Sequence, residues 1–148
     1  MGYYLKAYIG KKENLNLILK KYTESHIIEL ESGISMILMT DELFDEISND
    51  EGGFAISKFE FLDKNVEQKT IDLVGDKEVA YVESEFFGGK GGHIGVIWKN
   101  KQRVFLGKFK KNTMNEVLKR LGVKRTTVKD EFETVGLGKN RYIEDWIE

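Results

Sequence analysis

The chain has no cysteine and no proline, and it has only two histidines. The missing thiols exclude disulfide bonds, cysteine nucleophiles and zinc sites that use cysteine ligands. Without proline, the turns have to be built from glycine, asparagine, aspartate and serine. Both absences narrow the chemistry and the turns that this sequence can use.

Long apolar runs are absent as well. No run of about 18 apolar residues is present to span a bilayer. The N-terminal letters M-G-Y-Y lead into an expected strand instead of the apolar centre of a signal peptide. We therefore expect a cytoplasmic protein with no membrane partner. With 148 residues, 41% of them hydrophobic, the chain is predicted to form a single domain over residues 1–148.

The charge is distributed unevenly along the sequence. The net charge of −2 is composed of −8 in residues 1–98, +10 in residues 99–129 and −4 in residues 130–148. We call residues 99–129 the basic segment. Such a block can give one face a potential that attracts an anionic partner, so nucleic-acid binding is one functional alternative. The aromatic residues within it, Phe105 and Phe109, are predicted to belong to the core.

Strand and helix patterns are mixed along the chain. Strands are predicted at 3–9, 26–30, 34–39, 54–61 and 102–106, with a β-hairpin at 79–99. Helices are predicted at 15–22, 40–49, 63–74, 113–121 and 142–147, with Thr113 as a cap residue. Short connections between adjacent strands require antiparallel pairing. The predicted class is α+β, a mainly antiparallel sheet with helices packed on it.

The hairpin at 79–99 is the most distinctive stretch, V-A-Y-V-E-S-E-F-F-G-G-K-G-G-H-I-G-V-I-W-K. Two apolar and aromatic runs flank a glycine cluster, and glycine readily adopts the positive φ of a tight turn. Pairing Phe87 with His93 across the loop 88–92 gives one apolar face, on which Trp98 is buried with Val82. The sequence therefore predicts a hairpin with one core face and one mixed face.

The mixed face of this hairpin carries the candidate catalytic residues, Glu83, Glu85 and His93. The two carboxylates would lie about 6 to 7 Å apart, a separation that overlaps the acid/base pairs of glycosidases. A small hydrolase is therefore an alternative function. The structural interpretation is an acidic edge satisfied by Lys99 and by loop amides. These carboxylates and the imidazole could also bind a divalent metal, but no metal site or cofactor is predicted, because His26 is far away in sequence and no ligand spacing repeats. His26 is expected to be a partly buried structural residue.

The glycine loop is predicted to be a mobile hairpin tip that takes part in binding. Its backbone N–H groups and Lys90 suit an anion, but the loop leads into a strand, whereas phosphate-binding loops lead into a helix. We therefore interpret it as a tip that contacts a partner. The predicted binding residues are Phe87, Gly89, Lys90, Gly91, His93 and Arg141.

Two segments together resemble a known group of proteins. The run E-S-E-F-F-G-G-K-G-G-H at 83–93 and the run F-E-T-V-G-L-G-K-N-R at 132–141, followed by E-D-W, resemble small, mostly uncharacterised bacterial proteins. In that pattern an acidic strand enters an aromatic-Gly-Gly-x-Gly loop, and glutamine would be expected where His93 stands. These proteins resemble the immunity partners of bacterial toxins, which act by binding.

The leading prediction is therefore a non-enzymatic binding protein of the immunity type, with a protein partner. The resemblance joins the C-terminal segment to the hairpin. Because a guanidinium can bind a carboxylate through two hydrogen bonds, we expect Arg141 to approach Glu83 and Glu85. Trp146 is expected to be anchored in the core beside it. The sequence predicts no oligomeric state.

Overall fold

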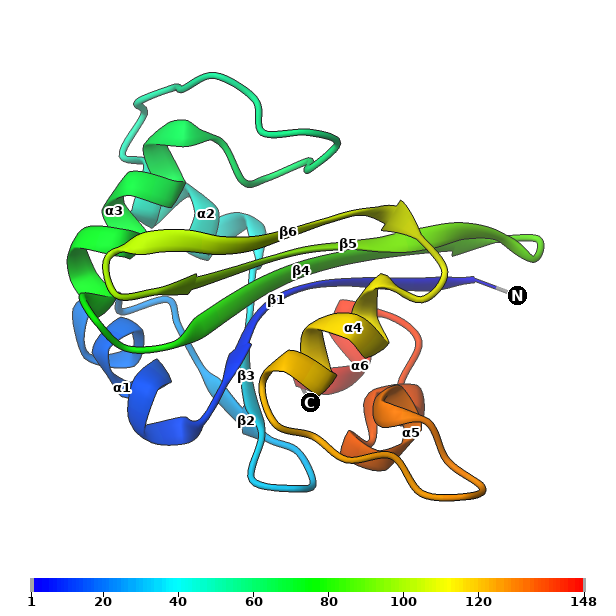
Figure 1. Ribbon diagram of the computed structural model, residues 1–148. Coiled ribbons are helices and arrows are strands. Elements are labelled where there is room, and N and C mark those ends of the chain that lie inside the picture. The colour runs from blue at the N-terminus through cyan, green and yellow to red at the C-terminus, as the bar shows by residue number, and fades with distance from the viewer. Residues whose placement is uncertain (1, 148) are drawn as a thin grey trace.

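A six-stranded antiparallel sheet forms the centre of the computed structural model, which describes residues 2–147 (Figure 1). The strands follow one another across the sheet in the order β2-β3-β1-β4-β5-β6. Their bounds are β1 (Tyr3–Gly10), β2 (Ile27–Glu29), β3 (Ser35–Leu38), β4 (Val79–Phe87), β5 (Lys90–Lys99) and β6 (Gln102–Lys110). The predicted α+β class with an antiparallel sheet is confirmed.

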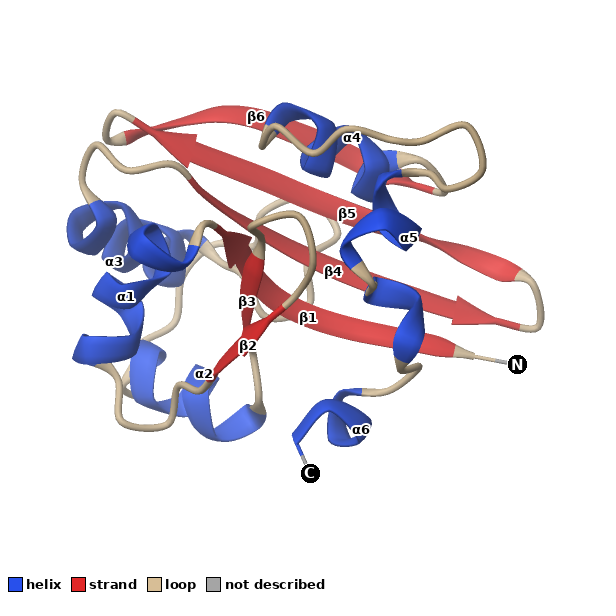
Figure 2. Ribbon diagram, turned by 90° about the horizontal axis from the view of Figure 1, so that it is seen from below, coloured by secondary structure: helices blue, strands red, loops and turns tan. Residues whose placement is uncertain are grey.

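Helices cover both faces of the sheet (Figures 1 and 2). The first face packs against α1 (Lys12–Lys21), α2 (Asp41–Ser48) and α3 (Lys64–Val74). The second face packs against α4 (Thr113–Arg120), α5 (Glu131–Val135), the 3-10 helix η1 (Leu137–Lys139) and α6 (Ile143–Ile147), which form a row across the strands in Figure 2. Each face therefore has its own core. No helix within residues 2–147 is long and apolar enough to cross a membrane.

The helix ends explain why the predicted helices form where they do. The Thr40 hydroxyl accepts a hydrogen bond from the backbone N–H of Leu43 at 3.1 Å, and Asp63 does the same for Val66 at 2.8 Å. These side chains satisfy donors that the first helical turn leaves free. Gly75 follows α3 with φ of 63°. The predicted helix at 63–74 is therefore confirmed.

The helix predicted at 113–121 also forms, but its start differs from the prediction. Asn112 is the N-cap residue, and Thr113 is the first helical residue. The Thr113 hydroxyl donates a hydrogen bond to the carbonyl of Lys108 at 2.5 Å, so it joins the helix to the end of β6 instead of capping it. Gly122 has φ of 100°, which suits the predicted glycine after the helix.

The strand predicted at 54–61 is wrong. Residues 49–62 form an irregular segment whose only ladder contact within the described chain is a bridge between Ala55 and Asp63. Ile56, Phe59 and Leu62 are buried in the core of the first face. Their spacing of three residues does not fit a strand, in which alternate residues share a face. The apolar residues of this segment therefore pack into the core of the first face instead of forming a strand of the sheet.

The hairpin register differs from the prediction. Phe87 pairs with Lys90 across a two-residue turn, in which Gly88 and Gly89 have φ of 59° and 80°. Two successive positive φ values are typical of the tightest hairpin turns and match the twist of the strands. The predicted loop 88–92 and the pairing of Phe87 with His93 are therefore wrong, because the first two glycines are sufficient to make the turn.

The corrected register exchanges the side chains between the two faces. Trp98 pairs with Val79 and is buried in the first-face core, so its predicted burial is confirmed. Val82, its predicted neighbour, lies on the second face. Residues 79–84 are all buried, so this part of the hairpin has two core faces instead of one core and one mixed face. A central strand covered on both sides needs apolar residues without alternation.

Candidate binding surface at the central hairpin

The predicted catalytic residues do not converge on one site. Glu83 and Glu85 project from the first face, as alternate residues of β4 must. His93 lies opposite Ser84 on the second face. The sheet itself separates His93 from the two carboxylates, so the arrangement predicted for a hydrolase is not formed.

Glu83 is a buried anchor for the irregular segment 49–62. Its carboxylate accepts hydrogen bonds from the backbone N–H of Glu60 at 2.6 Å and of Phe61 at 2.9 Å. The hydroxyl of Tyr81 donates a third bond at 2.7 Å. Loop amides satisfy this carboxylate as predicted, although they come from a distant segment, whereas the predicted contact with Lys99 is not formed within residues 2–147. The side chain is fully used in holding that segment on β4.

Lys6 extends this polar cluster on the neighbouring strand β1. It is buried, and its ammonium forms an ion pair with Glu60 at 2.8 Å and lies 3.8 Å from the centre of the Phe61 ring. Burial alone would lower the pKa of Lys6, but hydrogen bonds with Glu60 and Tyr4 raise it overall. Lys6 therefore stays charged, and most of its charge is neutralised by Glu60.

Glu85 differs from Glu83 because it is exposed. It lines a small cleft of about 70 Å³ that also includes Lys58 and Phe109. Within residues 2–147 its side chain makes no hydrogen bond or ion pair. Of the two predicted carboxylates, only Glu85 is available to a partner.

His93 is part of the second-face core. Its Nδ1 is 2.5 Å from the hydroxyl of Ser84, and the rings of Phe86 and Phe132 lie 4.9 and 5.7 Å away. Burial lowers the pKa of His93 to about 4, although the charge of Asp130 acts in the opposite direction. His93 is therefore neutral at pH 7 and only 7% exposed, which suits packing and not contact with a partner. No group of three potential metal ligands occurs within the described chain.

The tip of the hairpin, residues 87–91, projects beyond the helices and the neighbouring strands (Figure 1). The Phe87 side chain is 84% exposed, and Gly89 and Lys90 are exposed beside it. A Cβ at Gly91 would clash with the carbonyl of Glu85, so glycine is needed there to close the ladder. Four of the predicted binding residues thus gather at one apex, on a tight turn instead of a long loop.

Arg141 contacts β1, contrary to the prediction. Its guanidinium donates to the carbonyl of Gly2 at 3.3 Å, and its own carbonyl accepts from the backbone N–H of Tyr4 at 2.7 Å. Within residues 2–147 it forms no ion pair with either predicted glutamate. Trp146 packs against the second-face core, as predicted for an anchored C-terminal segment, but it is only half-buried.

The basic segment contains both paired and free cations. The Arg103 guanidinium binds the carboxylate of Glu67 at 2.7 and 2.8 Å, and Arg120 lies 4.1 Å from the centre of the Phe105 ring. Lys108 and Lys110 are exposed at the end of β6. Phe109 between them is 39% exposed, so its predicted place in the core is wrong.

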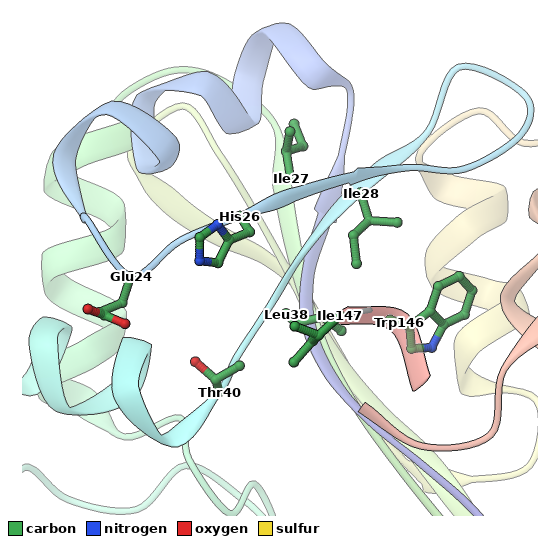
Figure 3. Close-up of a pocket in the computed structure, with 8 residues that line it drawn as sticks. All are labelled: Glu24, His26, Ile27, Ile28, Leu38, Thr40, Trp146 and Ile147. Atoms are coloured by element: carbon green, nitrogen blue, oxygen red, sulfur yellow. The ribbon is translucent and has the colours of Figure 1, made fainter. Parts of the chain in front are cut away.

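Two adjoining clefts beside α6 were not predicted from the sequence. The first, of about 280 Å³, lies between β2, the end of β3 and α6 (Figure 3). The second, of about 470 Å³, lies between the start of α2, β1 and α6. They share Thr40 and Ile147 as lining residues. His26 is exposed at one end of the first cleft, and its predicted partial burial is wrong. No local pattern joins residues from segments so far apart in sequence.

Comparison of the chain with protein family models, with curated proteins and with solved structures finds no match.

Proposed function

We propose that this chain is a non-enzymatic binding protein of the cytoplasm, of the immunity type, and that the hairpin tip contacts its protein partner. The single observation that carries the proposal is the exposure of Phe87 at the apex of a projecting hairpin. Large aromatic side chains supply much of the binding energy at protein interfaces. The two-residue turn fixes the backbone at Phe87, so little backbone freedom is lost on binding.

The surroundings of Phe87 support a polar rim around this contact. Lys90 pairs with Phe87 across the turn, and Glu85 is exposed two residues before it. Interfaces commonly surround an apolar anchor with charged residues that fix orientation. The hydrolase alternative has no comparable support, because Glu83 is fully hydrogen-bonded and His93 is buried on the other face.

A photoreactive phenylalanine analogue at position 87, introduced in the native host, tests this proposal. Irradiation is expected to join the protein covalently to one partner. Val128 is also 84% exposed but lies in the loop before α5, so the same analogue at position 128 is the matched control. Equal capture from both positions, or capture from neither, would contradict the proposal.

Nucleic-acid binding is a second candidate because of the position of Phe109. This ring is 39% exposed and stands between the exposed residues Lys108 and Lys110. Single-stranded nucleic acids bind where cations follow the phosphates and aromatic rings stack on bases. The salt dependence of retention on RNA separates this candidate from binding of a protein partner.

A further inference from the structure

Each of the two clefts beside α6 has an apolar floor. Leu38 is buried beneath the first cleft and Met39, the next residue, beneath the second, where Phe61 also contributes to the lining. Ile147, which lines both clefts, is 54% exposed. Because the clefts adjoin at Thr40 and Ile147, we call them together the groove; their volumes are about 280 and 470 Å³, the second within the range of ligand sites and the first just below it.

The rim of this groove is strongly acidic. Its carboxylates come from four separate segments of the chain and are Glu24, Asp41, Glu42, Glu60 and Glu144. The only lysine or arginine among the lining residues is Lys6, which is buried and paired with Glu60. Within residues 2–147, the side chains of the other four carboxylates make no hydrogen bond or ion pair. These four charges are therefore not offset by a direct ion pair within the described residues.

The basic segment does not compensate this charge. None of the lining residues of either cleft comes from residues 99–129. The cations of that segment lie at the end of β5, on β6 and the turns beside it, on α4 and in the following loop. Exposed charges farther apart than a Debye length of about 8 to 10 Å interact weakly at physiological salt. The groove thus presents a local negative potential to any partner.

We propose that this groove binds an extended segment of a partner protein in which lysine or arginine alternates with apolar residues. The inference rests on the proposed binding function and adds a surface separate from the hairpin tip. Apolar side chains of the segment fill the floor, and its cations pair with the rim. A ligand of this groove therefore needs both positive charge and apolar area. A polyamine lacks the apolar area, and a neutral apolar peptide lacks the charge.

Trp146 provides a direct signal for occupancy of the groove. It lines the first cleft (Figure 3), whereas the other tryptophan, Trp98, is only 1% exposed in the first-face core. A ligand in the groove therefore changes the fluorescence of Trp146 with little effect on Trp98. The Trp146→Phe variant should lose this signal, which identifies its source.

The experiment uses three short synthetic peptides with a fluorescent label, and anisotropy measures their binding to the full chain. One alternates lysine with leucine, one lysine with serine and one glutamate with leucine. The first peptide is expected to bind at least about tenfold more tightly than the other two, which corresponds to about 1.4 kcal/mol. Its affinity should fall as salt is raised.

Two matched double variants locate the binding. Glu24→Gln with Glu144→Gln should weaken the lysine-leucine peptide about threefold to tenfold, because exposed charge pairs contribute little individually. Glu13→Gln with Asp76→Asn removes the same charge from exposed sites outside the groove and should leave affinity unchanged. Glu144 and Glu13 both lie in the first turn of a helix, α6 and α1, so the two double variants remove the same helix-stabilising charge.

The outcomes separate this inference from the proposed function. The proposal for the groove would be overturned by any of three results. These are equal affinity for the three peptides, equal loss of affinity in both double variants, or displacement of the lysine-leucine peptide by spermine as effectively as by the unlabelled peptide. The Phe87→Ala variant should bind the lysine-leucine peptide normally. If crosslinking at position 87 succeeds but the lysine-leucine peptide does not bind in the groove, the inference fails and the proposed function stands.

Discussion

The carboxylate of Glu83 accepts a hydrogen bond from the backbone N–H of Phe61 at 2.9 Å, and this contact holds the irregular segment 49–62 on the sheet. Glu85 projects from the same face but is exposed. Sequence spacing alone makes the two residues look equivalent. Their environments assign a structural role to Glu83 and leave only Glu85 available for recognition.

Replacement of Glu83 should destabilise the fold far more than replacement of Glu85. Glu83→Ala leaves the N–H groups of Glu60 and Phe61 without acceptors, and we expect a loss of about 2 to 4 kcal/mol in the free energy of unfolding. Glu85→Ala should change it by less than about 0.5 kcal/mol. Urea denaturation measures both values. Similar midpoints for the two variants would show that Glu83 does not anchor this segment.

Trp98 should be among the most costly residues to truncate. It is 1% exposed, and its indole N–H donates to Glu67 at 2.9 Å. Trp98→Ala is expected to lower the free energy of unfolding by about 3 to 5 kcal/mol, as large aromatic core deletions do. Trp146→Ala, at a half-buried site, should cost clearly less in the same urea titration. The burial of Trp98 would be refuted by a midpoint close to that of the wild type.

Local signals predicted most of the secondary structure correctly. Thr40, Asp63 and Gly75 mark helix ends through side-chain caps and positive φ, which depend only on neighbouring residues. The same reasoning failed at 54–61, where Phe54, Ile56, Phe59 and Phe61 predicted a strand, whereas the structure buries Ile56, Phe59 and Leu62. Whether such a segment joins the sheet as a strand or packs on its face depends on the rest of the sheet. A short stretch of sequence does not contain that information.

The hairpin shows why the candidate site was harder to predict than the fold. The cluster G-G-K-G-G offers several turns, and each odd shift of register moves every later side chain to the other face. The structure uses Gly88 and Gly89, so His93 joins the second-face core. The groove beside α6 was beyond sequence reasoning, since residues near positions 26, 40, 60 and 146 meet only after folding.

Gly95 should tolerate no side chain unless its neighbour is reduced. A Cβ at this position would lie 2.7 Å from Cγ2 of Val117, so the glycine allows α4 to approach the sheet. Gly95→Ala is expected to cost about 1 to 3 kcal/mol through overpacking. The double variant with Val117→Ala should cost less than the sum of the single changes, which a double-mutant cycle measures. Strict additivity would contradict the close contact.

His93 should make stability depend on pH in the acid range. Its pKa is about 4 in the folded chain against 6.5 as its ordinary value, because burial disfavours the charged ring. Above pH 6.5 the ring is neutral in both states and adds no slope. Between pH 6.5 and 4 only the unfolded state takes up the proton, so stability falls with decreasing pH, by at most about 3 kcal/mol. Below pH 4 this contribution levels off.

The variant His93→Gln isolates this contribution. Carboxylates also titrate in the acid range, so the informative quantity is the difference between wild type and variant in the pH dependence of unfolding free energy. Glutamine keeps a hydrogen bond to Ser84 within reach but carries no titrating proton. We expect the variant to lose less stability between pH 6.5 and 4. Parallel curves would mean that His93 is not protonated on unfolding.

The exposed lysines at the end of β6 allow nucleic-acid binding to be tested. Lys108, Lys110 and Lys111 are exposed around Phe109, so phosphate contacts there should make retention on single-stranded RNA or heparin fall steeply with salt. Replacing these three lysines with glutamine should reduce the logarithmic salt slope for single-stranded RNA by about two if each contacts one phosphate.

The matched control for this experiment replaces Lys11, Lys20 and Lys21, three exposed lysines at the two ends of α1, with glutamine. Both triple variants change the net charge equally, so a general electrostatic effect lowers retention of both, whereas a site at β6 responds only to the first. Phe109→Ala should weaken RNA more than heparin, because heparin has no bases to stack. Weak retention at low salt, with a flat dependence in all variants, would exclude nucleic acid and leave the cations of β6 as a solvated face.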